Sequence, residues 1–322
     1  MDLFESLKNK IDGKNLTIVF PEGNEPRILN AAVKLNSAKI LKPILIGNKE
    51  DITKVAGDNS LDLGDIQIID PNEYSEFDDM VDAFVERRKG KNTKEQAETM
   101  LKDNNYFGTM LVYQDKANGM VSGAIHSTGD TVRPALQIVK TAPGNSRISG
   151  AFVLQKGDQR YLFSDCAINI NPNAQELGEI AVQAAKSAPL FDIDPKVAML
   201  SFSTMGSAKS DEVTKVAEAT KVAQKLAPEI PIDGELQFDA ALVPSVGNQK
   251  APDSKVAGNA NVFVFPELEA GNIGYKIAQR FGGYDAVGPI LLGLDKPISD
   301  LSRGCNADDV FKLSILTAAL AL

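Results

Sequence analysis

The sequence predicts an α/β protein of two domains with mainly parallel sheets. Short apolar runs alternate along the chain with longer segments whose apolar residues recur every three or four positions. These two patterns are typical of buried strands and amphipathic helices. Their regular alternation indicates parallel sheets with helices on both faces. The length of 322 residues is sufficient for two such domains.

The first part of the chain repeats the pattern of strand and helix. Its predicted elements are, in order, a strand at 16–20, a helix after Pro26, strands at 43–47 and 66–70, and helices at about 78–89 and 93–103. Pro71 ends the third strand, because proline cannot continue a ladder of hydrogen bonds. An apolar segment at 119–124 then leads into a polar turn.

The composition changes after residues 141–145, where we expect a domain boundary. The predicted elements that follow are a hairpin of strands 148–154 and 160–163, a helix near 174–187, a strand at 196–201, a helix near 211–226, a strand at 261–265 and a helix that opens near 269–276. An apolar run at 289–292 precedes a final helix. We therefore expect residues 1–143 with 290–322 as one domain, and residues 144–289 as the other.

Composition and charge exclude several classes of protein. The formal net charge is −9 and no basic block is present, so non-specific nucleic-acid binding is disfavoured. An anionic ligand would need a local cluster of cations. The two cysteines, Cys166 and Cys305, lack the paired spacing of a metal or disulfide site. With no long apolar segment and no signal sequence, we expect a cytoplasmic protein.

The turn at residues 299–309 combines three chemically useful side chains. Ser302 supplies a hydroxyl, Arg303 a permanent cation and Asp309 a carboxylate. In open α/β proteins, turns at the carboxyl ends of strands face the ligand crevice. The turn therefore offers a hydrogen-bond donor, an anion clamp and a base. The alternative is structural, since Asn306 and Asp309 could simply cap the last helix.

A second polar turn, at residues 125–136, suits an anion. It contains the hydroxyls of Ser127, Thr128 and Thr131. Proline is favoured at the first position of a helix, so we expect a helix from Pro134 to about residue 140, with Arg133 extended just before it. Orphan N–H groups at a helix start, beside an arginine, attract negative charge. An ordinary capped turn is the alternative.

A third candidate is the glycine-rich helix start that contains Gly271 and Asn272. It could admit the pyrophosphate of a ligand. Two glycines alone are weak evidence, however, and an ordinary turn between strand and helix is the competing interpretation.

Several long segments together resemble the phosphate acetyltransferases (phosphotransacetylases) in their short form. They include SGAIHSTGDTVRPALQIVKTAPG, LFSDCAINI, VAMLSFST, DGELQFDAA, ANVFVFPELEAGNIGYKIAQRFGGYDAVGPIL and KPISDLSRGC. The similarity extends over nearly the full length and is densest after residue 118. It implies two α/β domains with an active-site cleft between them, as in isopropylmalate and isocitrate dehydrogenases, with the C-terminal stretch returning to the first domain.

The resemblance also implies an activity and its partners. Members of this family exchange an acetyl group between coenzyme A and inorganic phosphate, with coenzyme A as a substrate and without a metal or bound cofactor. They are commonly homodimers.

The functional residues implied by the matching motifs are Ser302, Arg303, Asp309, Arg133 and one arginine of the segment 86–89. At that segment Arg88 is the match, although the neighbouring Arg87 leaves the choice open. One departure concerns Met205, which stands where the family often has a lysine.

The chemistry of acyl transfer fits these residue types. Arg133, Arg303 and Arg88 offer planar forks for phosphate oxygens, and Ser302 could donate to the developing oxyanion. Asp309 is the candidate base for the thiol. A free aspartate (pKa ~3.9) and a thiol (pKa ~8.5) differ by roughly 6 kcal/mol, so desolvation or concerted transfer must narrow the gap.

Four alternatives stand beside this hypothesis. His126 could activate Cys305 or Cys166 as a covalent acyl carrier. A dehydrogenase is disfavoured, since neither a clean Gly-x-Gly-x-x-Gly turn nor an aspartate cluster for a metal is evident. A preference for butyryl or longer groups stays open, because one methylene changes the discrimination between two substrates by only ~1–3 kcal/mol. The presence of Arg133, Arg303 and Asp309 together with Ser302 argues against a non-enzymatic regulatory module.

Overall fold

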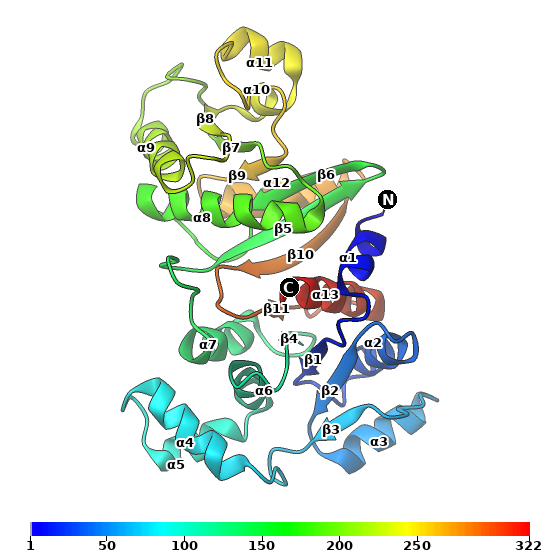
Figure 1. Ribbon diagram of the computed structural model, residues 1–322. Helices are drawn as coiled ribbons and strands as arrows, with labels where there is room; N and C mark the ends of the chain where they lie inside the picture. Colours follow the sequence, from blue (N-terminus) through cyan, green and yellow to red (C-terminus); the bar gives the residue numbers. More distant parts are fainter. Residues whose placement is uncertain (1) are drawn as a thin grey trace. The chain divides into compact units, whose positions relative to one another are not determined.

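The computed structural model describes residues 2–322, which divide into two compact units (Figure 1). The first unit comprises Leu7–Ala142 and Leu294–Leu322. The second comprises Pro143–Gly293 together with the residues up to Ser6. Each unit is built on its own sheet, so the mixed α/β class predicted from the sequence is confirmed.

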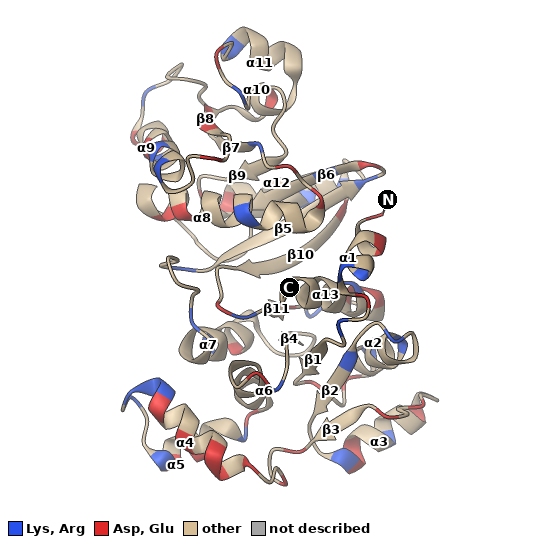
Figure 2. Cartoon of the chain, in the orientation of Figure 1, with Lys and Arg blue, Asp and Glu red and all other residues tan. Residues whose placement is uncertain are grey.

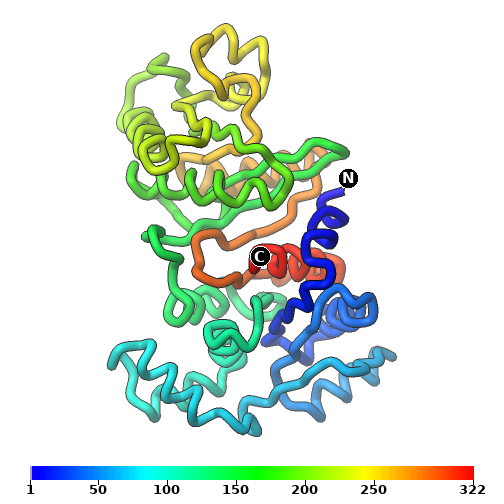
Figure 3. Tube along the Cα trace, in the orientation of Figure 1, coloured from blue at the N-terminus to red at the C-terminus, as the bar shows by residue number. Residues whose placement is uncertain are grey.

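The first unit is built on a five-stranded sheet in the order β11-β4-β1-β2-β3. The strands are β1 (Thr17–Phe20), β2 (Lys42–Ile46), β3 (Gln67–Ile69), β4 (Gly119–Ser122) and β11 (Ile298–Asp300). All neighbouring strands are parallel. Strand β11 comes from the C-terminal segment, which thus returns to the first unit, as the resemblance implied (Figure 3).

Helices pack on this sheet and close its core. They are α2 (Pro26–Ser37), α3 (Lys49–Asp58), α4 (Phe77–Arg88), α5 (Lys94–Leu101), α6 (Asn104–Tyr113), α7 (Thr128–Ile138) and α13 (Ala307–Ala319). Helix α1 (Leu3–Ile11) begins in the segment that belongs to the second unit and ends in the first. Phe84 of α4, Phe107 of α6 and Ile138 of α7 join strand residues Val19 and Met120 in one buried cluster. This cluster fixes α4, α6 and α7 to the same side chains of the sheet.

Helix α7 begins six residues before the expected start. The prediction was wrong because a capping box outweighs the proline signal. The Asp130 carboxylate accepts the N–H of Ser127 at 3.1 Å and its hydroxyl at 2.7 Å, which favours a helix from Thr128. Pro134 therefore lies inside the helix, and Arg133 is helical rather than extended. Likewise, the expected helix at 93–103 is α5 alone, because Asp103 caps a separate helix, α6.

The second unit has a six-stranded mixed sheet in the order β10-β5-β6-β9-β7-β8. Its strands are β5 (Ser149–Lys156), β6 (Gln159–Ser164), β7 (Val197–Leu200), β8 (Ile232–Leu236), β9 (Val262–Val264) and β10 (Asp285–Leu292). The pair β5 and β6 forms the predicted antiparallel hairpin. The expected boundary at residue 290 falls inside β10, where Ile290 pairs with Ala151 of β5, so residues 290–293 belong to the second unit.

The helical segments of the second unit are α8 (Ala174–Ser187), the 3₁₀ helix Ala188–Phe191, α9 (Asp211–Leu226), α10 (Phe238–Leu242), α11 (Pro244–Lys250) and α12 (Leu268–Arg280). The sequence did not predict β8, α10 or α11. Along residues 2–322, no helix combines the length and the apolar character that a membrane crossing requires.

Candidate functional site

Three loops meet at the carboxyl edge of the first unit's sheet. They follow β1, β4 and β11, which are neighbours in the order β11-β4-β1. In the register of the sheet, Asp300 at the end of β11 pairs with Ser122 at the end of β4. Because parallel strands end at the same edge, this register brings the polar turns at 125–136 and 299–309 side by side.

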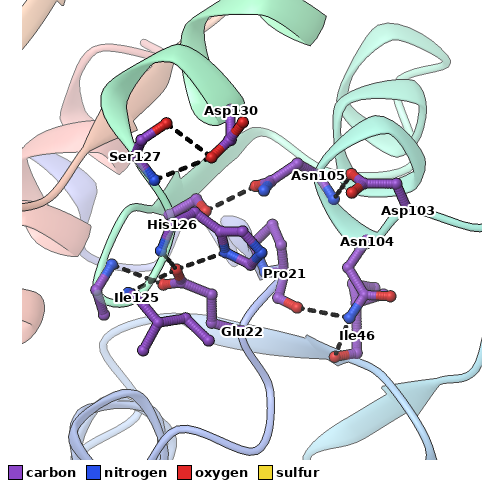
Figure 4. A network of polar contacts seen from close by, with 12 residues as sticks. Pro21, Glu22, Ile46, Asp103, Asn104, Asn105, Ile125, His126, Ser127 and Asp130 are labelled. Atoms are coloured by element: carbon purple, nitrogen blue, oxygen red, sulfur yellow. Dashed lines mark hydrogen bonds and ion pairs between the residues drawn. The ribbon is translucent and has the colours of Figure 1, made fainter. Parts of the chain in front are cut away.

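Glu22, in the loop after β1, holds the loop between β4 and α7. Its buried carboxylate accepts the backbone N–H groups of Ala124, Ile125 and His126 at 2.8 to 2.9 Å (Figure 4). The Nδ1 atom of His126 lies 2.7 Å from the same carboxylate. These contacts satisfy a carboxylate that would be costly to bury without partners. The sequence analysis missed Glu22, whose signal was an acidic residue in the turn after the first strand.

Arg27, at the start of α2, connects the other two loops. Its Nη1 atom donates to the carbonyl oxygens of Arg303 and Cys305, both at 2.9 Å. Its Nη2 atom donates to the carbonyl oxygen of Ala124 at 2.9 Å, and its Nε atom to Glu25 at 2.6 Å. One guanidinium thus fixes the β4–α7 and β11–α13 loops to a single helix. The sequence analysis missed Arg27 as well.

Arg303 and Arg133 keep their guanidinium groups unpaired within residues 2–322. Arg303 lies in the loop after β11 and Arg133 in α7, and both side chains are exposed. Neither group has an ion pair or hydrogen-bond acceptor among the described residues. Both arginines lie on segments that follow neighbouring strand ends, so in a protein of net charge −9 they are candidates for an anion site.

Ser302 and the hydroxyls of α7 differ in exposure. Ser302 is exposed, and its Oγ atom accepts the N–H of Gly304 at 3.3 Å. Ser127 is the exposed N-cap residue of α7. Thr128 donates its hydroxyl to Asp300 at 2.6 Å. Thr131 is completely buried, so this predicted ligand contact lies beneath the surface.

Asp309 takes part in the cap of the last helix, which the sequence analysis gave as the structural alternative to a catalytic role. Its Oδ2 atom accepts the N–H of Asn306 at 2.9 Å, and the Asn306 side chain accepts the N–H groups of Asp308 and Asp309. The cap holds the exposed carboxylate of Asp309 in one place. Its charge reaches Cys305, where it adds to the effect of burial in raising the pKa of the thiol. The role of Asp309 as a base stays a prediction.

The two neighbouring arginines of α4 have different surroundings. Arg87 donates from Nε to the carbonyl oxygen of Ile138 at 2.6 Å and from Nη2 to that of Val139 at 2.8 Å. It therefore caps the last carbonyls of α7, a structural task. Arg88 donates from Nε to Asn92 at 3.0 Å. Only its terminal nitrogens are without a partner among the described residues, which favours Arg88 as the ligand arginine.

A basic cluster lies at the end of α4 (Figure 2). It consists of Arg87, Arg88, Lys89, Lys91 and Lys140, defined by their effect on Lys140, whose pKa is lowered by burial and then by the charges of the other four. Arg133 and Arg88 are also both close enough to the Tyr106 hydroxyl to oppose the rise in its pKa caused by burial. The acidic chain thus carries the local cation cluster that an anionic ligand requires.

The cysteines do not have the surroundings of activated nucleophiles. Burial raises the pKa of Cys305 and raises that of Cys166 well above its ordinary value. The ring of His126 is held by Glu22 and has no contact with either thiol among residues 2–322. A thiolate is the reactive form of cysteine, so these surroundings disfavour the covalent alternative.

Gly271 and Asn272 are the fourth and fifth residues of α12. A side chain at Gly271 would place a Cβ atom 2.1 Å from the carbonyl oxygen of Asp165, so this glycine permits close packing. Asn272 donates to the carbonyl oxygen of Cys166 at 3.1 Å. The helix begins at Leu268, and the Glu267 carboxylate already accepts its free N–H groups. The helix therefore opens within one residue of the expected start, and ligand binding by these two residues stays a prediction.

Met205 lies in an exposed loop of the second unit. Its backbone has a positive φ of 47° and its N–H bonds the carbonyl oxygen of Glu235. A lysine at this position would present its charge to solvent, and the methionine supplies none.

The fold and this edge define the class of the protein: an α/β protein with polar loops gathered at the carboxyl ends of parallel strands. The chain matches the phosphate acetyl/butaryl transferase family over residues 2–318, and it belongs to that family. It is 60% identical to a phosphate acetyltransferase of Bacillus subtilis, over 100% of this chain and 99% of the relative.

Solved structures agree with this assignment. The EutD phosphotransacetylase from Staphylococcus aureus is 59% identical, with a TM-score of 0.96 over 100% of this chain and 98% of its own. A putative 4-hydroxythreonine-4-phosphate dehydrogenase from Salmonella typhimurium shares the fold at 12% identity, with a TM-score of 0.56 over 95% and 99% of the two chains. The expected likeness to a dehydrogenase fold is thereby confirmed.

Proposed function

We propose that this chain transfers an acetyl group between coenzyme A and inorganic phosphate, with no bound cofactor. The observation that carries the proposal is the pair of unpaired guanidinium groups, Arg303 and Arg133, on segments that begin at neighbouring strand ends. Membership of the phosphate acetyl/butaryl transferase family supports the same reaction. The two cysteines of the chain are unpaired, as is common in a reducing compartment. This, together with the proposed use of coenzyme A, fits the cytoplasmic location expected from the sequence.

The phosphate group of acetyl phosphate would bind between α7 and the β11–α13 loop. Arg303 and Arg133 would bond its oxygens through planar forks. The N–H groups of Thr128 and Gly129 have no acceptor among residues 2–322, and such orphan groups at a helix start attract anions. Ser127 adds a hydroxyl at the same turn. These donors would also stabilise the phosphate as it leaves.

The reaction then proceeds by direct attack. The sulfur of coenzyme A forms a bond to the carbonyl carbon of acetyl phosphate, and the oxygen of that carbonyl becomes an oxyanion. Ser302 and Arg303 would stabilise the oxyanion. Its collapse breaks the bond between the carbonyl carbon and the phosphate oxygen, which releases inorganic phosphate and acetyl-coenzyme A.

Asp309 would take the proton from the thiol. Its helix cap uses Oδ2, and no partner among the described residues engages Oδ1, which is therefore the atom available for a proton. Proton transfer to a free aspartate is uphill by roughly 6 kcal/mol. Transfer concerted with attack avoids a free thiolate, and nearby Arg303 would stabilise the charge that develops on sulfur.

The phosphate groups of coenzyme A would bind at the basic cluster. Arg88 offers its free terminal nitrogens, and Lys89, Lys91 and Lys140 surround it with positive charge. Arg87 contributes charge to this cluster while it caps α7.

An assay of thioester formation from acetyl phosphate and coenzyme A tests the activity. We expect acetyl phosphate to be the preferred donor over propionyl and butyryl phosphates. A higher kcat/KM with butyryl phosphate would establish the longer acyl preference instead. Double-reciprocal lines that intersect would support direct transfer, whereas parallel lines with partial acetyl exchange would support a covalent acyl carrier.

We also propose that the chain forms a homodimer. Helix α12 exposes Ile273, Ile277 and Phe281 just after it, with exposed fractions of 56%, 53% and 91%. Their spacing of four residues makes one apolar stripe along the helix. Sedimentation of the wild-type chain should show a dimer, and Ile277→Asp should shift it to a monomer. Leu226→Asp, which alters an exposed leucine away from this stripe, should leave the dimer intact.

A further inference from the structure

Asp300 is a buried carboxylate at the end of β11, next to the loop of Ser302 and Arg303. Only 1% of its surface is exposed. Its Oδ2 atom accepts the hydroxyl of Thr128, the first residue of α7, at 2.6 Å. This distance is in the range of a hydrogen bond to an ionised carboxylate. One side chain therefore joins the strand that leads to Arg303 with the helix start proposed to bind phosphate.

The surroundings of Asp300 are shaped around this contact. A Cβ atom at Gly123, where φ is +108°, would lie 2.6 Å from Asp300 Oδ1, so the end of β4 approaches as closely as only glycine permits. The N–H of Leu301 bonds the carbonyl oxygen of Ser122 at 2.7 Å and completes the attachment. The absence of a side chain at Gly123 thus leaves room for the Asp300 carboxylate.

Two polar atoms in this place are buried and lack a hydrogen bond among residues 2–322. They are Asp300 Oδ1 and the hydroxyl oxygen of Thr131. Burial raises the pKa of Asp300 to about 6, against the hydrogen bond from Thr128, and the nearby charge of Glu22 adds to the rise. A buried, imperfectly satisfied carboxylate is costly to keep. Such a cost is more readily explained by function than by stability.

We propose that Asp300 is a positioning residue of the acyl-transfer site, which acts through Thr128 to hold the first turn of α7 beside the loop of Ser302 and Arg303. The inference rests on the proposed function, because the phosphate site is the feature that Asp300 would position. Asp300 does not touch the substrate. It orients the Thr128 hydroxyl and, with it, the free N–H groups of Thr128 and Gly129.

A double-mutant cycle in the complete enzyme tests the route through Thr128. Asp300→Asn removes the charge, and Thr128→Val removes the hydroxyl at nearly constant shape. Each should lower kcat/KM for acetyl phosphate by roughly tenfold to a hundredfold, the order of loss that a misplacement of about 1 Å produces. The double variant should be no less active than the less active single variant, since both changes act on the same contact: Asp300→Asn leaves a weaker, neutral acceptor and Thr128→Val removes the donor. Thr128→Ser, which keeps the hydroxyl, should restore most activity.

Two further measurements separate positioning from mere support of the fold. Asp300→Asn should unfold at pH 8 no more readily than the wild type, whereas a purely structural role predicts earlier unfolding. The KM for coenzyme A should change less than twofold, because the basic cluster is unaffected. Asp295→Asn, in the same connection five residues earlier, should match the wild type in every assay.

The outcomes are distinct from failure of the proposed function. If the wild type makes no thioester, the activity itself is wrong. If the wild type is active and Asp300→Asn keeps full kcat/KM for acetyl phosphate, the positioning role is wrong. Independent, additive losses in the double variant would also overturn it, because Asp300 would then act by another route.

Discussion

The starts of α7 and α12 look alike in the sequence but differ in what they offer a ligand. Both contain a glycine in the first turn or soon after it, and both were predicted to receive a phosphate. At α12 the Glu267 carboxylate accepts the N–H groups of Glu269 and Ala270, so the chain's own anion occupies the site. At α7 the cap is the neutral Ser127, and Asp130 turns back to the N–H and hydroxyl of that residue.

The charge of the capping side chain decides whether the N–H groups at a helix start are already occupied by an anion of the chain itself. A carboxylate cap stabilises the helix and also fills the place of a ligand. A serine cap leaves the orphan N–H groups free, and Arg133 lies in α7 itself. The following predictions would break or sharpen this difference, from the largest expected effect to the smallest.

The largest loss is expected at Asp309, which lies beside the anion site rather than in it. Asp309→Asn keeps an oxygen for the helix cap but removes the base, so kcat should fall by roughly 10²–10⁴-fold. Steady-state turnover with acetyl phosphate and coenzyme A measures the loss. Asp308→Asn, one residue earlier in the same first turn, should retain wild-type turnover. Equal turnover in Asp309→Asn would remove the assignment of the base.

Arg133→Ala should act on phosphate binding. A hydrogen bond to a charged group is worth about 1.5–3 kcal/mol, so the KM for acetyl phosphate should rise by roughly 10- to 100-fold, with a smaller change in kcat. Initial rates at varied acetyl phosphate measure the effect. Lys54→Ala removes an exposed cation elsewhere in the first unit and should leave KM unchanged. A loss confined to kcat would contradict a binding role.

The pH dependence of stability tests the buried carboxylate beneath α7. Because the pKa of Asp300 is raised from 3.8 to about 6, the folded state holds a proton that the unfolded state has lost between these values. Stability from this group therefore falls as pH rises, by about 3 kcal/mol in total above pH 7 and about half of that at pH 5. Asp300→Asn should remove this loss of stability, because asparagine does not titrate.

Chemical denaturation of both proteins at pH 5 and pH 8 measures this difference. The variant should gain stability relative to the wild type as pH rises. A constant difference between the two pH values would show that Asp300 does not titrate in this range.

The smallest effect is expected at α12. Glu267→Gln should lower the free energy of unfolding by about 1 kcal/mol through its weaker cap, measured by denaturant titration. It should not change KM for either substrate, because the Glu267 carboxylate already occupies the N–H groups at this helix start. A rise in KM for coenzyme A would return α12 to the site and weaken the contrast with α7.

The sequence predicted most of the fold because its strands are short apolar runs with clear ends. It misplaced the start of α7, since the proline signal at Pro134 competed with the capping box of Ser127 and Asp130. It missed β8, whose residues include Asp233, Gly234 and Glu235 and so lack the apolar run of a buried strand. Local sequence patterns therefore identify helices and strands, but the predicted bounds of an element are inaccurate where two local signals conflict.

The site was predicted only as far as its exposed residues. Arg303, Arg133 and Ser302 stand out through a polar turn next to a strand. Glu22 and Arg27 were not found, because their role is to bond backbone groups of loops about a hundred and nearly three hundred residues away. Such contacts depend on the order of strands in the sheet, which no local spacing reveals. The choice between Arg87 and Arg88 likewise required the carbonyl groups at the end of α7.

The account depends on Arg133 and Arg303 binding one and the same phosphate group. A double-mutant cycle of Arg133→Ala and Arg303→Ala, read as kcat/KM for acetyl phosphate, measures their coupling. Convergence on one phosphate predicts that the double variant loses far less than the product of the two single losses, because either change alone disrupts the shared site. Losses that multiply fully would show that the two arginines act at separate places and would contradict the account.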